Sequence, residues 1–322
     1  MAKGGIRESA SFDTKAEAVA WATKVEAEID QGKRRSYAKI AKTLSDAFDK
    51  YERDISPDLG GHGWNVTRLK FLRGELSFIG EQIRKIKPEM IEAWRDKRLK
   101  LVKTSTVNRD LNLISAVFEA ARTEWKWMPI NPVHEVKRPK NPDNRTRRVS
   151  DDEMRIMVEA LGLQADAAPK TANHFTALAF MFAVETGMRT GEIMALTWEH
   201  AFADKRYVHV RKSKNGDARD VPLSTRAVEL LGRLPREKGE PRCFRLSKSG
   251  IKMAWWEARN RAALKHPAVA DLHFHDSRHE ATTRLSRKLN VLALAKMIGH
   301  RDLKSLMIYY DETAAELAAR LD

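Results

Sequence analysis

Cysteine is almost absent: the 322-residue chain has only one, Cys243. A single thiol cannot form an intramolecular disulfide, and it also excludes zinc fingers that are built on several cysteines. These exclusions fit a reducing compartment, and we expect Cys243 to be a small, buried apolar residue.

Long apolar segments are missing as well. No run of apolar residues in the sequence approaches the roughly 20 that a membrane-spanning helix needs. The first 11 residues also lack the apolar stretch of a signal peptide. We therefore expect a cytoplasmic protein that has no membrane partner.

Acidic residues are in deficit. The chain has 44 Asp and Glu against 59 Lys and Arg, which gives a net charge of +15. Such a surplus favours a polyanionic partner, and with a membrane disfavoured, nucleic acid is the expected one. The chain is also too long for one ordinary core, so we expect two domains of roughly 100 to 200 residues each.

The first half of the chain is rich in apolar residues with a helical period. One apolar stripe runs through residues 44–55 and a second through residues 69–83, a short helix is expected after Pro88, and a fourth after residues 104–106. Four such helices predict a small bundle, which we assign to residues 37–135.

The preceding segment, residues 1–36, predicts the end of a strand near Ser11 and then a helix. Asp13 or Thr14 is expected to cap this helix, and Gly32 to close it. The segment is too short to hold a core of its own.

A proline-containing basic segment, residues 136–148, follows the bundle and is interpreted as an interdomain linker. It is either a solvated loop or a strap that contacts DNA phosphates when two basic domains close around a duplex. The basic residues of the segment, all candidates for DNA binding, are Lys137, Arg138, Lys140, Arg145, Arg147 and Arg148.

The remainder, residues 149–322, is mainly helical with one interruption. Residues 207–210 and 221–223 flank the polar segment KSKNGDARD, which predicts a β-hairpin. The last helix is expected at residues 313–321. The predicted fold class is therefore mainly α, with a small β-sheet or hairpin in the second domain.

Polar residues capable of chemistry lie near the expected helix ends of this second domain. Each one alone has an ordinary explanation, such as a surface charge, a hydrogen-bonded histidine or a packed tyrosine. A metal site at His273, His275 and His279 is not expected, because an HExxH motif is absent, no cysteine is near and Arg278 would repel a cation. The candidates are Arg189, Lys214, His275, Arg278, His300 and Tyr309.

Taken together, these residues resemble the motifs of the tyrosine recombinase, or phage integrase, family. TGMRTGEIMALTW matches a first box TGxRxxExxxLxW, and residues 275–279 match a second box HxxRH. His300 in a GH pair, followed by Tyr309 nine residues later, matches a third box, and the turn SKNG lies between the first two. The likeness is strong from about residue 149 to the end and weaker over the helical domain. It implies a two-domain, C-shaped clamp around duplex DNA.

The resemblance also implies roles for the cationic residues. Arg189 and Arg278 would grip the scissile phosphate, because a planar guanidinium donates paired hydrogen bonds to phosphate oxygens. Lys214, in a tight turn with Asn215 and Gly216, would be the general acid that protonates the departing 5′-oxygen.

Further roles follow in the same way. Tyr309, chosen over Tyr310 by its spacing from His300, would be the nucleophile. His275 and His300 would assist proton transfer or hydrogen-bond the phosphate, and which of them acts as base stays open. Glu192, which follows Arg189 by three positions, would orient a neighbouring catalytic side chain or serve as an N-terminal helix charge.

The implied function is site-specific recombination, that is, integration or excision of a mobile element such as a prophage. The implied partners are double-stranded DNA, three further copies of the chain in a homotetramer on two recombination sites, and accessory directionality or DNA-bending proteins. No metal or cofactor is expected, and the setting would be the nucleoid of a bacterium or a phage-infected cell. Residues 1–36 resemble only the last strand and helix of the arm-site-binding domain of phage integrases, so arm-site binding stays open.

Two alternatives remain. A type IB topoisomerase uses similar phosphate chemistry as a monomer, but the helical domain and the box spacing favour a recombinase. A DNA-binding regulator that lost catalysis is disfavoured because every catalytic residue type is present.

Overall fold

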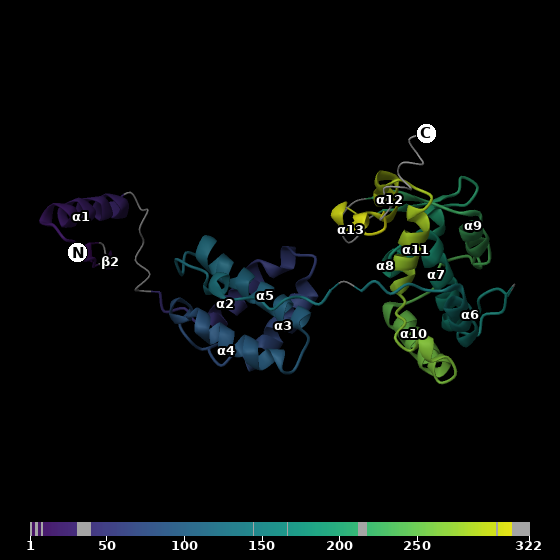
Figure 1. Ribbon diagram of the computed structural model, residues 1–322, viewed down its shortest axis with the longest axis horizontal. Coiled ribbons are helices and arrows are strands. Elements are labelled where there is room, and N and C mark those ends of the chain that lie inside the picture. The colour runs from purple at the N-terminus through teal and green to yellow at the C-terminus, as the bar shows by residue number, and fades with distance from the viewer. Residues whose placement is uncertain are drawn as a thin grey trace, which may run out of the picture. The chain divides into compact units, whose positions relative to one another are not determined.

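The computed structural model describes residues 2–3, 6–7, 9–30, 40–143, 145–165, 167–211, 218–300 and 302–310. The chain divides into two compact units, Met1–Asn144 and Arg145–Asp322 (Figure 1). Each unit has a hydrophobic core of its own.

The first unit starts with two short strands and a helix. β1 (Ala2–Lys3) pairs antiparallel with β2 (Ile6–Arg7), and α1 (Lys15–Asp30) follows. The predicted cap at Thr14 is confirmed, because its hydroxyl accepts a hydrogen bond from the backbone N–H of Glu17 at 3.3 Å. The strand predicted near Ser11 is wrong: residues 9–14 form no strand, since this polar stretch makes the turn into the capped helix. Gly32 lies outside the described residues.

Four helices build the core of the first unit, as predicted. They bury apolar stripes against one another, with Phe48 and Phe118 fully enclosed. A capping box between Thr43 and Asp46 starts the first of them. The helices are α2 (Leu44–Asp54), α3 (His62–Glu75), α4 (Pro88–Leu99) and α5 (Thr104–Thr123), with short 3₁₀ turns η1 (Ser56–Asp58), η2 (Ile83–Lys85) and η3 (Pro132–Glu135).

The second apolar stripe is only partly helical. α3 ends at Glu75, whereas the predicted stripe continues to Ile83. Leu76 and Ile83 are buried all the same, because the segment around residues 79–83 hydrogen-bonds backbone groups of residues 42–45. Apolar periodicity there reflects burial from a loop and not from a helix.

The first part of the predicted linker follows the first unit. Val136 is buried in its core, and Asn108 of α5 donates a hydrogen bond to the carbonyl of Pro139 at 2.8 Å. Arg138 donates to the side-chain oxygen of Asn112 at 2.7 Å. Lys137 and Lys140 are exposed.

The second unit is built around α7, which is apolar on all sides and buried along most of its length. It contacts α9, α10 and α11, and Figure 1 shows α11 running beside it. The helices are α6 (Asp151–Ala160), α7 (Ala172–Thr186), α8 (Thr190–Ala195), α9 (Thr225–Gly232), α10 (Lys248–Ala263), α11 (Asp276–Ser286), α12 (Val291–Ile298) and α13 (Lys304–Met307), with 3₁₀ turns η4 (Trp198–His200) and η5 (Pro267–Val269).

A small antiparallel sheet interrupts these helices. Its strands β3 (Ala201–Phe202), β4 (Tyr207–Val210) and β5 (Arg219–Pro222) are arranged in the order β3-β4-β5. Val208 and Val221 pair across β4 and β5 and face the core. The predicted hairpin and the mainly α fold class are therefore confirmed, while the turn at residues 212–217 and the helix expected at residues 313–321 lie outside the described residues.

Two expectations from composition can be compared with the structure. Cys243 is fully buried in the second core, as predicted, and burial raises the pKa of its thiol to about 12. In the described part of the chain, no helix has the length and apolarity to cross a membrane.

Candidate active site

The first box lies where α7 ends and α8 begins. Gly187 ends α7 with a φ of +65°. A Cβ at this position would lie 3.0 Å from a methyl group of Ile298 in α12. Glycine is therefore required both by the backbone and by the close approach of the third-box helix. The turn places Arg189 directly before the first residue of α8.

Glu192 is buried between two arginines. Its carboxylate accepts one hydrogen bond from the backbone N–H of Arg189 and one from the Arg189 guanidinium, both at 3.0 Å. Arg219 of β5 donates two more, at 3.0 and 2.7 Å, and both side chains of this pair are 6% exposed. Burial by itself raises the pKa of Glu192, but the hydrogen bonds outweigh burial and hold the pKa below its ordinary value. Glu192 is thus an ionised carboxylate that holds the Arg189 side chain.

Arg278 ties the first and third boxes together. Its side chain is buried in α11, and its guanidinium donates to the carbonyl of Gly187 and, at 2.8 Å, to the carbonyl of Ile298. Burial and the charge of Arg189 lower the pKa of Arg278 to about 9. The empty site therefore disfavours its own positive charge, which an anion bound beside Arg278 would stabilise.

Three histidines surround these arginines. His275 precedes α11, and burial followed by the charge of Arg278 lowers its pKa. His300 follows Gly299, and burial with the charges of Arg278 and Arg189 lowers its pKa to about 4. His279, one helical turn after His275, has a pKa that burial also lowers. Among the described residues, no three His, Cys, Asp or Glu side chains are grouped so that they could hold a metal ion.

Tyr309 lies just after α13, and its hydroxyl is 2.5 Å from Nδ1 of His279. Burial raises the pKa of this phenol, while the charge of Arg278 opposes the rise. The hydroxyl of Tyr310 instead donates a hydrogen bond to the carbonyl of Leu289 at 2.7 Å. The two adjacent tyrosines thus face different surroundings.

The second unit brings most of the predicted site residues together. Arg189 and Arg278 influence each other's surroundings, and Arg278 acts electrostatically on His275, His300 and Tyr309. Lys214 lies outside the described residues, so its expected role stays a prediction.

Two site residues were missed from the sequence, Arg219 and His279. Arg219 had a usable signal: it stands two positions before buried Val221 in a strand, so alternation puts its charge on the inward face. His279 was quoted in the second box, but only its neighbours were given roles.

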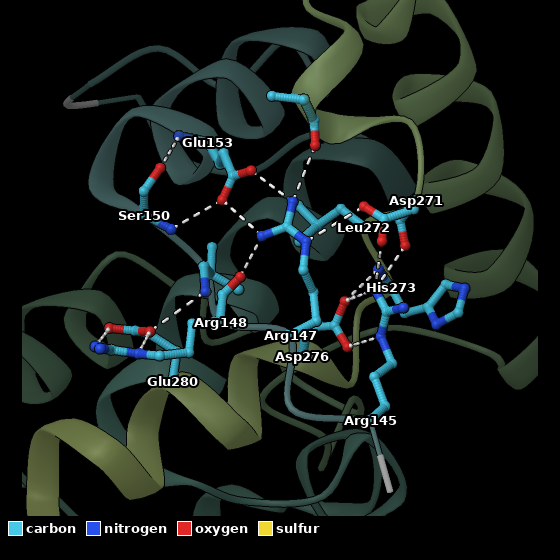
Figure 2. Close-up of polar contacts among 12 residues, drawn as sticks. Arg145, Arg147, Arg148, Ser150, Glu153, Asp271, Leu272, His273, Asp276 and Glu280 are labelled. Carbon is cyan, nitrogen blue, oxygen red and sulfur yellow. Dashed lines mark hydrogen bonds and ion pairs between the residues drawn. The ribbon is translucent and has the colours of Figure 1, made fainter. Parts of the chain in front are cut away.

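Three linker arginines lie against the second unit. Arg145 donates to both oxygens of Asp276, at 2.7 and 2.8 Å, and that carboxylate also accepts the backbone N–H of His273 (Figure 2). Arg148 donates to both oxygens of buried Glu280, at 3.0 and 3.2 Å. These contacts fasten the chain entering this unit to the start of α11, where the second box lies.

Arg147 makes the third of these attachments. Figure 2 shows its guanidinium between the carboxylates of Glu153 and Asp271. It also donates to the carbonyl of Ala268 at 2.9 Å. The three arginines predicted to bind DNA are therefore paired with carboxylates in this structure, and their contact with DNA stays a prediction.

Comparisons with known proteins agree with the motifs. The model of the phage integrase family matches residues 147–316. A putative integrase/recombinase of Haemophilus influenzae is 35% identical over 320 residues, which are 98% of this chain and 84% of that protein. A shufflon-specific DNA recombinase of Escherichia coli is 34% identical over 290 residues, which are 87% of this chain and 72% of that protein.

Solved structures share the fold. A lambda integrase dimer bound to a COC′ core site matches with a TM-score of 0.67 and 18% identity, over 92% of this chain and 87% of that chain. The Tn1549 transposon integrase in complex with a circular intermediate DNA also has a TM-score of 0.67, with 17% identity over 87% of this chain and 99% of that chain. With the family match over more than half of its length, the chain belongs to the phage integrase family of tyrosine recombinases.

Proposed function

We propose that this chain cleaves and rejoins DNA through a covalent 3′-phosphotyrosine intermediate on Tyr309. The observation that carries the proposal is the gathering of Arg189, Arg278 and His300 around a half-buried phenol in a single unit. Like-charge repulsion among these groups lowers the pKa values of Arg278 and His300. Such a cluster favours an anion, and a DNA phosphate is the anion that the family acts on.

The two arginines are suited to the transition state. In-line attack on a phosphodiester places growing negative charge on the non-bridging oxygens, and fixed guanidinium donors stabilise that charge. Arg189 is held by Glu192, and Arg278 by two backbone carbonyls. Donors held in this way need little reorganisation when the phosphate enters.

The reaction would proceed in two reversible steps. The phenolic oxygen of Tyr309 forms a bond to phosphorus, the bond to the 5′-oxygen breaks, and Lys214 protonates that leaving oxygen. A 5′-hydroxyl then attacks the phosphotyrosine and releases the phenol. Because one phosphodiester replaces another, the bond energy is kept and no external energy source is needed.

For the whole protein we propose a clamp that closes on duplex DNA. The helices of residues 37–135 would bind the core site, and the exposed linker residues Lys137, Arg138 and Lys140 would contact phosphates. A homotetramer on two sites is supported by the lambda integrase tetramer solved on a Holliday junction, whose chain matches with a TM-score of 0.68. Accessory directionality or DNA-bending proteins would be further partners.

The biological task would be integration or excision of a mobile element such as a prophage, at the nucleoid of a bacterial or phage-infected cell. The family match and the shufflon-specific relative support DNA rearrangement in general. Sequencing the DNA that is covalently trapped on the protein in cells would identify the recombination site.

A nicked suicide duplex carrying that site tests the chemistry. After cleavage the short 5′ fragment diffuses away, so the covalent adduct accumulates and shifts on a denaturing gel. Tyr309→Phe should bind the duplex normally but form no adduct, because only the phenolic oxygen is removed. Tyr310→Phe is the matched control and should still form the adduct. An adduct that persists with Tyr309→Phe and disappears with Tyr310→Phe contradicts the proposal.

A further inference from the structure

The nucleophile lies next to a base candidate that is neither of the two histidines favoured from the sequence. The hydroxyl of Tyr309 and Nδ1 of His279 are 2.5 Å apart, and the two ring centroids are 6.1 Å apart. His279 is the side-chain partner of this hydroxyl among the described residues. A phenol can donate its proton along this contact only if Nδ1 is unprotonated.

We propose that His279 is the general base that takes the proton from Tyr309 during DNA cleavage and returns it during rejoining. The inference rests on the proposed phosphotyrosine chemistry and adds a catalytic residue to it. It also leaves His275 and His300 for the phosphate.

The electrostatics of the site favour this direction of proton transfer. Burial, together with Arg278 and Arg145, lowers the pKa of His279, while Asp276 on the same helix opposes the change. The ring is therefore neutral at neutral pH and offers a lone pair. Burial raises the pKa of Tyr309, so this phenol does not ionise by itself at that pH and needs a base.

The other two histidines have different surroundings. Both face Arg278 and Arg189, the predicted phosphate-binding pair, and those charges contribute to lowering their pKa values. A phosphate held by the two arginines would therefore lie close to both imidazoles. Hydrogen bonding to that phosphate is the role that this placement supports for His275 and His300.

The proton balance closes within this site. In cleavage the bond between the Tyr309 oxygen and phosphorus forms, its proton moves to Nδ1 of His279, and the bond to the 5′-oxygen breaks as the general acid protonates it. In rejoining the 5′-hydroxyl attacks, its proton returns to that acid, and the imidazolium of His279 reprotonates the departing phenol. No oxidant, metal or further reactant is consumed.

The test combines His279→Asn with a more acidic nucleophile. Asparagine can keep a hydrogen-bonding group near the position of Nδ1 but cannot accept a proton at neutral pH. Single-turnover cleavage of the suicide duplex should slow by about 100- to 10,000-fold, the usual contribution of a general base. Replacing Tyr309 by a fluorinated tyrosine, whose phenol ionises more easily, should then recover at least tenfold of that loss. DNA affinity, measured by mobility shift, should stay within about twofold of the wild-type value.

His275→Asn is the matched comparison on the same helix. Its cleavage defect should be the same with either nucleophile, because a phosphate ligand does not deprotonate the phenol. Wild-type cleavage by His279→Asn, or a defect that fluorination leaves unchanged, overturns the assignment of His279. Adduct formation at Tyr309 in the wild-type chain, read from the same gels, tests the proposed function separately.

Discussion

Replacing Arg219 by methionine should destabilise the second unit by about 3 to 5 kcal/mol, the usual cost of removing one partner from a buried ion pair. Arg219 and Glu192 are both 6% exposed and share two hydrogen bonds. Arg219 also donates to the carbonyl of Met297 at 2.9 Å, which methionine cannot replace. Because Arg189 continues to contact Glu192, we expect a value near the lower end, about 3 kcal/mol.

The pH dependence of this loss has a defined sign. In the wild-type chain the pKa of Glu192 is below its ordinary value of 4.5, so its contribution to stability is present above that pH and is lost as pH falls through the lower folded-state pKa. Without Arg219, burial should move the pKa of Glu192 upward. The destabilisation by Arg219→Met should therefore be largest near pH 7 and shrink as the pH approaches 4.

Hydrogen exchange of the α7 amides measures the opening of the second unit in the full chain. Adding Glu192→Gln to Arg219→Met should restore part of the lost stability at pH 7, because it removes the uncompensated charge. Arg226→Met is the control: it breaks the Arg226–Glu229 pair on α9, whose side chains are both 55% exposed, and should cost at most about 1 kcal/mol. A loss below about 1 kcal/mol for Arg219→Met, or one that does not change between pH 7 and pH 4, would refute the reasoning.

Two further predictions concern the linker and the general acid. Neutralising Lys137, Arg138 and Lys140 together should weaken target and random duplexes alike and make the slope of log affinity against log salt shallower, by up to about 0.9 for each phosphate that the chain no longer neutralises, whereas an unchanged slope would make this part of the linker a solvated spacer. Neutralising Arg145, Arg147 and Arg148 should chiefly lower the stability of the second unit measured by hydrogen exchange, because each leaves a carboxylate without its partner. Lys214→Ala should slow cleavage of an ordinary phosphodiester severely but be largely rescued when sulfur replaces the bridging 5′-oxygen, since the thiolate leaves without an acid; equal defects on both substrates would exclude Lys214.

The elements that the sequence predicted well are those in which local pattern and burial agree. The stripe with Leu44, Phe48 and Tyr51 lies on one face of α2, and all three residues are buried there. The hairpin was equally readable, because Val208 and Val221 alternate with polar neighbours and face the core. In these segments the period of the apolar residues is the period of the backbone.

Prediction failed where distant segments supply the partner. Leu76 and Ile83 continue the stripe of α3, yet the chain leaves the helix at Glu75 because its backbone groups bond residues 42–45. The linker arginines show the same limit. Arg145 finds Asp276 across 131 residues of sequence, so a run of positive charge that suggested DNA contacts contains ion pairs that no local pattern reveals.

The adjacent tyrosines show how spacing and surroundings can support the same choice by different routes. Spacing from His300 singled out Tyr309 but offered no chemical reason to prefer it. In the structure the hydroxyl of Tyr310 donates its proton to the carbonyl of Leu289, which has no means of accepting it permanently. The hydroxyl of Tyr309 instead contacts an imidazole whose lowered pKa leaves it ready to accept a proton. A phenol becomes a useful nucleophile only when its proton has somewhere to go, and of the two contacts only the one at Tyr309 meets that requirement.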